Sequence, residues 1–269
     1  MQLKLFINLT DKPEMKTFEK DSLKVKVLDT TAQMGQCAAD ELAERIKLLL
    51  KEKEEINMIF AAAPSQSAFL QSLIEKKDID WTRINVFHMD EYIGVDASRP
   101  QSFANFLSRS IFSLLPFRSV NYINGVAPEV QQQCSRYARL LEEHPVDIVC
   151  LGVGENGHIA FNDPAFADFN DPKLVKVVEL DPVCRGQQVR EKCFETLDEV
   201  PREAITLTIP ALLRADWMFC IVPFTNKAEA VRRMLEEEIC EACPASILRN
   251  KRNSCLYLNN DSASLLTIA

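Results

Sequence analysis

The stretch Val146-Asp-Ile-Val-Cys-Leu-Gly-Val-Gly-Glu-Asn-Gly-His-Ile-Ala-Phe-Asn-Asp-Pro164 decides the fold. Its apolar run, residues 148–151, is too short for a helix and ends at a glycine, which predicts a buried strand. Three of the chain's seven glycines follow within six residues, at 152, 154 and 157, which indicates backbone that bends or approaches another group closely. A strand that opens into a polar, glycine-rich loop is the usual site-bearing geometry of an open α/β sheet.

Three interpretations of this loop compete. The run from Gly152 to Gly157 formally matches the dinucleotide-binding fingerprint, with Asp181 near the place of its acidic partner. That fingerprint needs a helix directly after the third glycine, and Pro164 interrupts the segment, so we reject it. A turn with an incidental histidine and a small-molecule site around His158 remain. Because polar side chains such as His158 and Asp163 rarely follow a buried strand without use, we favour the site.

Composition sets the broad class of the protein. The chain has 269 residues, 47% hydrophobic and 26% charged, which suits one α/β domain over residues 1–269. The formal net charge of −8 gives no support for binding to nucleic acid or to an anionic membrane. Since no apolar run approaches about 18 residues, we expect no transmembrane segment.

Nine cysteines are scattered along the chain, several of them in apolar runs (Cys150, Cys220, Cys255). No signal-peptide pattern precedes them, so we expect reduced thiols in the cytoplasm and no disulfide framework. Cys240-Glu-Ala-Cys243 invites a metal or redox interpretation. One such pair without a second pair or nearby histidines is a weak signal, and we favour the end of a helix running into Pro244.

Hydrophobic periodicity predicts alternating strands and helices. This alternation favours a three-layer α/β/α fold, with a mostly parallel, Rossmann-like sheet covered by helices on both faces. Thr30 or Thr31 can cap the first helix, and Ser102 a later one. The predicted strands are residues 23–28, 56–63, 84–88, 148–151, 174–180, 205–209, 217–222 and 255–258. The predicted helices run from residue 31 to about residue 50, from about residue 68, and over residues 103–114 and 130–143.

Polar side chains gather where predicted strands end. Residues 65–67 (Ser-Gln-Ser) precede a helix, where hydroxyls and backbone amides can cradle a phosphate, although simple N-capping is the better local interpretation. Asp90 ends the next strand, and His158 follows the central one, a combination that suits proton transfer. Arg185, Arg190 and Lys227 can each be a surface charge, but cations near strand exits can also hold an anion. Together these residues predict a pocket for a small anionic substrate.

The chain resembles the glucosamine-6-phosphate deaminase (isomerase) family over most of its length. Phe87-His-Met-Asp-Glu-Tyr-Ile-Gly94 resembles the family's F-x-M-D-E-Y-x-G strand exit. Residues 152–164 resemble its G-x-G-x-[DN]-G-H-I-x-F-N-E-P loop, and Pro244-Ala-Ser-Ile-Leu248 resembles a block near the C-terminus. Two long motifs in the right order are highly specific. The related 6-phosphogluconolactonases lack the M-D-E-Y block and the I-A-F-N continuation, so the deaminase branch is favoured.

The resemblance implies conversion of an amino-sugar 6-phosphate into fructose 6-phosphate and ammonium, with no metal and no organic cofactor. Asp90 is then the general base that moves a proton between C2 and C1. His158 is the ring-opening acid/base, and Asp163 orients it. Asn156, at a position where many members carry Asp, is limited to hydrogen bonding. The residues expected to contact the substrate or its phosphate are Ser65, Gln66, Ser67, Glu91, Gly154, Arg190 and Lys227.

The chain also departs from the family pattern. Asp163 replaces the usual Glu and is one methylene shorter, so its contact with His158 is expected to shift or to need a water. Residues 63–67 (Ala-Pro-Ser-Gln-Ser) lack the glycines of the usual Thr-Gly-Gly-Thr loop. Residues 165–176 differ from members that have an allosteric amino-sugar phosphate site, so we do not expect that regulation.

Two alternatives remain. One is another phosphosugar reaction, either deamination of galactosamine 6-phosphate or hydrolysis of a lactone. The other is a non-catalytic phosphosugar sensor, although binding alone would need neither Asp90 nor His158. The C4 epimer and the oligomeric state stay open, with a homo-oligomer as one option because the family includes monomers and hexamers. The irregular, charge-rich character of residues 171–199 suggests a lid.

Overall fold

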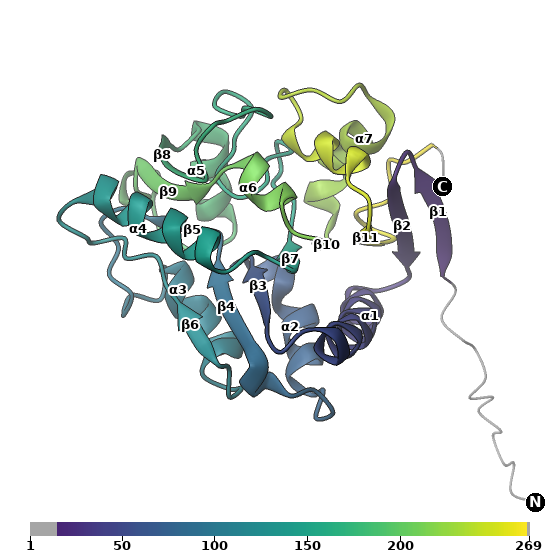
Figure 1. Ribbon diagram of the computed structural model, residues 1–269. Helices are drawn as coiled ribbons and strands as arrows, with labels where there is room; N and C mark the ends of the chain where they lie inside the picture. Colours follow the sequence, from purple (N-terminus) through teal and green to yellow (C-terminus); the bar gives the residue numbers. More distant parts are fainter. Residues whose placement is uncertain (1–14, 268–269) are drawn as a thin grey trace, which may run out of the picture.

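The computed structural model describes residues 15–267, and an eight-stranded sheet lies at its centre (Figure 1). Its strands follow the order β1-β2-β11-β10-β7-β3-β4-β6. Neighbouring strands are parallel except for β1 and β2, which form an antiparallel hairpin at one edge, and this confirms the predicted mostly parallel sheet. The strands are β1 (Lys16–Lys20), β2 (Leu23–Leu28), β3 (Ile56–Phe60), β4 (Ile84–His88), β6 (Ser119–Asn121), β7 (Ile148–Leu151), β10 (Trp217–Val222) and β11 (Ser254–Asn259).

Three further strands form a small antiparallel sheet, β5 (Asp90–Tyr92), β9 (Glu203–Leu207) and β8 (Val175–Glu179), in that order. The sequence located β8 and β9 as strands, but their expected place in the parallel sheet is wrong. Periodicity reports that a segment is extended and buried, and it does not report which strand it pairs with. β5 spans three residues, too few to leave a periodic signal.

The helices match the predictions where the apolar period is long. Thr30 caps α1: its hydroxyl accepts a hydrogen bond from the Gln33 nitrogen, and the Gln33 side chain accepts one from the Thr30 nitrogen. No helix in the described part of the chain is long and apolar enough to cross a lipid bilayer. The α-helices are α1 (Thr31–Glu52), α2 (Ser67–Ile74), α3 (Phe103–Leu107), α4 (Val130–Glu143), α5 (Pro182–Arg190), α6 (Ile209–Leu213) and α7 (Ala228–Glu236). A π-helical turn (Ser108–Phe112) continues α3, and 3₁₀ turns cover Pro64–Gln66, Trp81–Arg83, Leu197–Glu199, Thr225–Lys227 and Pro244–Asn250.

Two apolar cores lie on opposite faces of the large sheet. Successive side chains of a strand point to opposite faces, so each buried strand contributes to both cores. On β7, Ile148 and Cys150 pack in the core with α1, α2 and α3, whereas Val149 and Leu151 pack in the core with α4, α6 and α7. Helices therefore cover both faces, as the predicted three-layer α/β/α fold requires.

The strand order brings the predicted site residues together. The carboxyl ends of parallel strands lie at the same edge of a sheet, and β10, β7, β3 and β4 are consecutive neighbours. Lys227 follows β10, His158 follows β7, Gln66 follows β3, and Asp90 follows β4. Residues far apart in the sequence thus meet at one edge.

Residues 171–199 are not irregular, contrary to the expectation from sequence. They contain β8 and α5. The N-cap of α5 is Asp181, whose carboxylate accepts a hydrogen bond from the Val183 nitrogen at 2.7 Å, and Pro182 occupies the first helical position. The segment is therefore an ordered part of the fold.

We expect Gly35→Ala to destabilise the protein. A Cβ at Gly35 in α1 would lie 2.7 Å from the carbonyl carbon of Ala68 in α2, so the two helices would have to separate. Such overpacking costs about 1–3 kcal/mol, more than the gain of up to about 1 kcal/mol from replacing glycine by alanine in a helix. Gly186→Ala is the matched control, because a Cβ there would meet the flexible end of Arg190 at 3.1 Å. The urea midpoint should fall for Gly35→Ala and hold or rise for Gly186→Ala; equal midpoints would contradict close packing of α1 on α2.

Candidate active site

A cavity of about 370 Å³ lies at the carboxyl ends of β3, β4, β7 and β10. One side is formed by residues that follow these strands, and the other by α5 and the residues after it. The predicted site residues that line the cavity are Ser65, Gln66, Asp90, Gly154, His158 and Lys227. The residues from α5 and the segment after it are Gln187, Gln188, Glu191, Lys192 and Cys193.

The His158 imidazole packs against Gly154. A Cβ at Gly154 would overlap the ring, so only glycine leaves room for it. Nδ1 of His158 lies 2.8 Å from Oδ1 of Asn156 and 3.0 Å from Oδ1 of Asp163. Because both oxygens are acceptors, Nδ1 carries a proton, and the neutral ring has its lone pair on Nε2.

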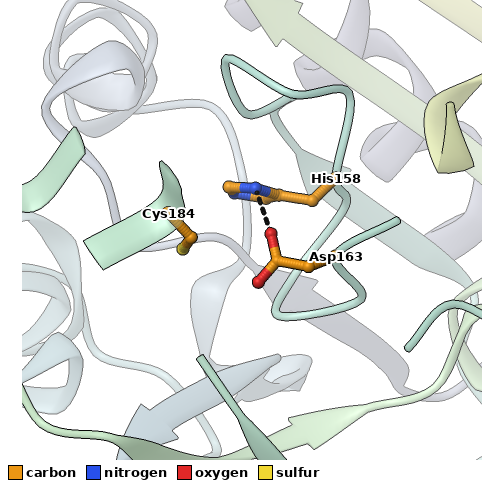
Figure 2. A group of neighbouring side chains, drawn as sticks. All are labelled: His158, Asp163 and Cys184. Carbon is orange, nitrogen blue, oxygen red and sulfur yellow. Dashed lines mark ion pairs between the residues drawn. The ribbon is translucent and has the colours of Figure 1, made fainter. Parts of the chain in front are cut away.

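Asp163 lies next to the His158 ring, on the Nδ1 side (Figure 2). Its carboxylate is fully buried and accepts hydrogen bonds from Nδ2 of Asn156 at 2.9 Å and from the backbone nitrogen of Asp181 at 3.4 Å. Burial opposes its ionisation, but the hydrogen bonds from His158 and Asn156 hold the pKa of Asp163 below its usual value. The shorter side chain therefore contacts His158 directly and fixes its tautomer.

Asp90 is the buried carboxyl group of the cavity, with an exposed fraction of 7%. Burial, and then the charge of Glu91, raises the pKa of Asp90 well above its usual value. A carboxyl group that takes and returns a proton near neutral pH needs a shift in this direction. Burial also lowers the pKa of the neighbouring His88 to about 3, so its imidazole stays neutral beside Asp90.

Glu91 does not line the cavity, so the geometry contradicts its expected contact with substrate. Its carboxylate accepts hydrogen bonds from the backbone nitrogens of Phe103 at 3.1 Å and Ala104 at 2.9 Å, and from the Ser102 hydroxyl at 2.7 Å. These donors form the N-terminus of α3, which Glu91 caps. Neighbouring residues of a strand point to opposite faces, so β5 directs Asp90 to the cavity and Glu91 to the helix.

Two lysines supply positive charge to the cavity. The Lys227 side chain is 3% exposed, and its ammonium lies 3.6 Å from the Glu191 carboxylate. Burial lowers the pKa of Lys227, against the opposing effect of Glu191. Lys192 also lines the cavity, from a left-handed backbone position with φ of 59°. The site predicted from the sequence includes Lys227 but not Lys192.

Arg190 and Ser67 lie outside the cavity, against the prediction. The Arg190 guanidinium pairs with Glu155, which also accepts a hydrogen bond from Asn226 at 2.9 Å. Ser67 is exposed at the start of α2. The Arg190 side chain, at the end of α5, points to Glu155 in the loop after β7. Lys192, two residues later, lines the cavity where Arg190 was expected. Arg185 does not line the cavity either and donates hydrogen bonds to the carbonyl oxygens of residues 197 and 200.

The glycine loop is braced by the segment after α7. Gly157 has a φ of 89°, and a Cβ there would lie 2.8 Å from Sγ of Cys243. The Ala245 nitrogen donates a hydrogen bond to the Gly157 carbonyl at 2.9 Å. Cys240 and Cys243 are free thiols in the turn after α7, not at a helix end as predicted. Cys243 therefore supports the loop that carries His158.

Cys184 of α5 is a further group beside the His158–Asp163 pair (Figure 2). A ring nitrogen of His158, a carboxylate oxygen of Asp163 and Sγ of Cys184 all lie within 4.8 Å of one another. Burial, followed by the charges of Asp163 and Asp90, raises the pKa of the Cys184 thiol well above its usual value. The thiol is therefore neutral next to an ionised carboxylate.

The family model for glucosamine-6-phosphate isomerases and 6-phosphogluconolactonase matches residues 29–257. The chain belongs to this family. Within it, the chain is similar to the glucosamine-6-phosphate deaminase of Listeria welshimeri, with 33% identity over 212 residues (79% of this chain and 88% of the relative). The glucosamine-6-phosphate deaminase of Bacillus cereus strain B4264 is 30% identical over 247 residues, 92% of this chain and 90% of the relative.

Solved structures of the family confirm the predicted fold. A monomeric glucosamine-6-phosphate deaminase has a TM-score of 0.81 at 29% identity, and the match covers 90% of this chain and 99% of that one. The 6-phosphogluconolactonase of Thermotoga maritima has a TM-score of 0.71 at 20% identity, over 87% and 98% of the two chains. At that lower identity the likeness shows the fold alone.

We expect Asp90→Asn to stabilise the folded protein as the pH rises. The folded-state pKa of Asp90 is raised, so below the unfolded value of about 4 both states are protonated and the carboxyl group costs nothing. Above it the unfolded state ionises more easily, and stability falls until the pH passes the folded pKa. Asparagine removes this loss, which amounts to about 1.4 kcal/mol for each pH unit that separates the folded pKa from the unfolded one. The gain in melting temperature should be larger at about pH 8 than at about pH 4.

Glu91→Gln is the matched control for Asp90→Asn. The amide nitrogen of glutamine cannot accept hydrogen bonds from the N-terminus of α3, and each donor left unpaired costs about 1–3 kcal/mol. Burial raises the pKa of Glu91 too, but the unpaired donors outweigh the gain from removing its charge, so this variant should melt at a lower temperature than the parent at neutral pH. Stabilisation by both substitutions, or by neither, would contradict the different surroundings of the two carboxyl groups.

Proposed function

We propose that this protein converts glucosamine 6-phosphate and water into fructose 6-phosphate and ammonia. The observation that carries the proposal is that Asp90 and His158 line one cavity together with Lys192 and Lys227. Proton-transfer groups and cations in one small cavity suit a phosphorylated sugar. The deaminases to which the chain is similar support the choice of an amino sugar.

His158 serves as the acid/base that opens the sugar ring. Its Nδ1 proton is held by Asp163 and Asn156, so Nε2 takes a proton from the anomeric hydroxyl and returns one to the ring oxygen. Asn156 fixes the position of the His158 ring relative to Asp163. Its Oδ1 accepts a hydrogen bond from Nδ1 of His158, and its Nδ2 donates one to the Asp163 carboxylate. An amide in this place orients the histidine without exchanging protons itself.

Asp90 serves as the base of the isomerisation. Its carboxylate takes the C2 proton of the open-chain sugar, which leaves an enolamine, and the proton returns at C1. The resulting C2 imine adds water and releases ammonia, which completes the ketose. The raised pKa of Asp90 makes its carboxylate a stronger base than an exposed aspartate.

The phosphate is proposed to bind to Lys227 and Lys192, next to Ser65 and Gln66. This changes the cation pair expected from the sequence, because Arg190 pairs with Glu155 outside the cavity. Glu191 lies among these groups and holds the Lys227 ammonium at 3.6 Å in the free protein. The phosphate has to compete with this carboxylate for Lys227.

Ammonia release from glucosamine 6-phosphate, coupled to glutamate dehydrogenase, tests the proposal on the full chain. We expect turnover that falls by about 10²–10⁴-fold in Asp90→Asn, the usual contribution of general acid–base catalysis. Lys51→Ala, an exposed change near the end of α1, is the control and should keep full activity.

Other substrates distinguish the alternatives. Ammonia from galactosamine 6-phosphate alone would assign the other C4 epimer, and hydrolysis of 6-phosphogluconolactone would assign the lactonase reaction. Binding of glucosamine 6-phosphate without turnover would replace the enzyme by a sensor. Any of these three results would overturn the proposal.

Glu191→Gln should lower the KM for the sugar phosphate and the inhibition constant for inorganic phosphate. Removing one negative charge close to the phosphate is worth about 1 kcal/mol or more, so a change of at least roughly fivefold is expected. Glu179→Gln, an exposed change on β8, is the control for net charge. An unchanged KM in Glu191→Gln would place the phosphate elsewhere in the cavity.

We also propose a cytoplasmic location, supported by nine cysteines that are all free thiols. Sedimentation of the purified chain tests whether it forms a homo-oligomer.

A further inference from the structure

We propose that Cys184, His158 and Asp163 form an inhibitory binding site for a zinc ion. The three residues come from two parts of the chain, the β7 loop and α5, and they supply a sulfur, a nitrogen and an oxygen ligand (Figure 2). Zinc accepts all three ligand types and prefers a tetrahedral arrangement. Three protein ligands leave the fourth position to a water from the cavity, which His158 lines.

The distances suit a metal between these groups. Two ligands that are each about 2.0–2.1 Å from a tetrahedral zinc lie about 3.3 Å apart. Nδ1 of His158 and Oδ1 of Asp163 are 3.0 Å apart, close to that separation. The ligand atoms all lie within 4.8 Å of one another, so small side-chain shifts bring all three to bonding distance from one metal ion.

Neighbouring groups already orient the ligands. Asp163 accepts hydrogen bonds from Asn156 at 2.9 Å and from the Asp181 nitrogen at 3.4 Å, and these hold its carboxylate in place. Such outer contacts orient metal ligands and raise affinity. The carboxyl groups of Asp163 and Asp90 act on the Cys184 sulfur and favour a divalent cation there. The Lys227 ammonium opposes it.

Metal binding would stop the proton transfer proposed for His158. Zinc replaces the proton on Nδ1, which moves to Nε2, and the Cys184 thiol releases its proton to the solvent. The ring then has no lone pair left to accept a proton from the substrate. The metal site stands on its own geometry, whereas the inhibition rests on the proposed function.

Equilibrium dialysis of the full chain against Zn²⁺, without substrate, tests the site. We expect one tightly bound zinc per chain and a loss of affinity of more than about tenfold in Cys184→Ser, since even outer contacts of a metal site are worth about that much. Co²⁺ should give a thiolate charge-transfer band that disappears in Cys184→Ser. Cys240→Ser, which breaks the Cys240–Cys243 pair, is the matched control and should keep both signals.

Further variants distinguish the loss of a zinc ligand from the loss of the fold. Cys184 is buried, so Cys184→Ala and His158→Gln are measured as well, with circular dichroism to show that each variant is folded. Loss of zinc in folded Cys184 and His158 variants supports the site. No bound zinc in the parent chain, unchanged affinity in Cys184→Ser, or loss in Cys240→Ser would overturn it.

Inhibition is measured separately. Zn²⁺ should inhibit ammonia release from the parent chain, EDTA should restore it, and Cys184→Ala should need a more than about tenfold higher Zn²⁺ concentration. A chain that binds zinc through Cys184 but has no deaminase activity would refute the proposed function and leave the metal site intact. Equal inhibition of the parent and Cys184→Ala would refute the inhibitory role of this site.

Discussion

The hydrogen bonds that join β10, β7, β3 and β4 side by side are the constraint on which the site depends. Each strand delivers its functional group within a few residues of its carboxyl end, so the sheet sets the spacing of those groups. Asp90 begins the short strand β5, and the other groups come from the segments that follow β3, β7 and β10. The brace between Gly157 and the segment after α7 shows how a distant stretch of chain keeps His158 in place.

Two adjacent carboxyl groups have different roles because their surroundings differ. Asp90 and Glu91 differ by one methylene and one position, and burial raises the pKa of both. Glu91 finds its donors at the N-terminus of α3, so its carboxylate is committed to the fold. Asp90 faces the cavity, where a proton can be exchanged with a ligand. Asp90, whose carboxyl group faces the cavity, is therefore the one that can exchange a proton with a substrate.

Much of this arrangement could be predicted from the sequence. The strands β4, β7 and β10 are buried, mostly apolar segments with clear ends, so their bounds agree with the prediction. Asp90, Gly154, His158 and Lys227 follow those strands directly, and the side of the sheet on which they lie follows from parallel pairing. The pairing of β8 and β9 could not be predicted, because a strand's burial pattern does not name its partner.

The helix α5 could not be predicted from the sequence, and this omission affected the predicted site most. α5 has little apolar periodicity, and its signal was the Asp181-Pro182 start, a helix cap followed by proline at the first position. Without that helix, Glu191 and Lys192 had no predicted location, and Arg190 was the natural choice of cation. α5 ends at Arg190, and the left-handed backbone at Lys192 turns the chain there, so two neighbouring cations point in different directions.

The wall formed by α5 is attached differently from the rest of the cavity. Arg190 and Asn226 meet on the Glu155 carboxylate, and Arg185 holds the backbone after the helix. Cys184 and Val189 of α5 also pack in a small apolar cluster, separate from the two large cores. The opposite wall is part of the sheet and shares its apolar core. Side chains of α5 that face the cavity can therefore change without disturbing the cores of the large sheet, and a new sugar preference is open to this scaffold through one short helix.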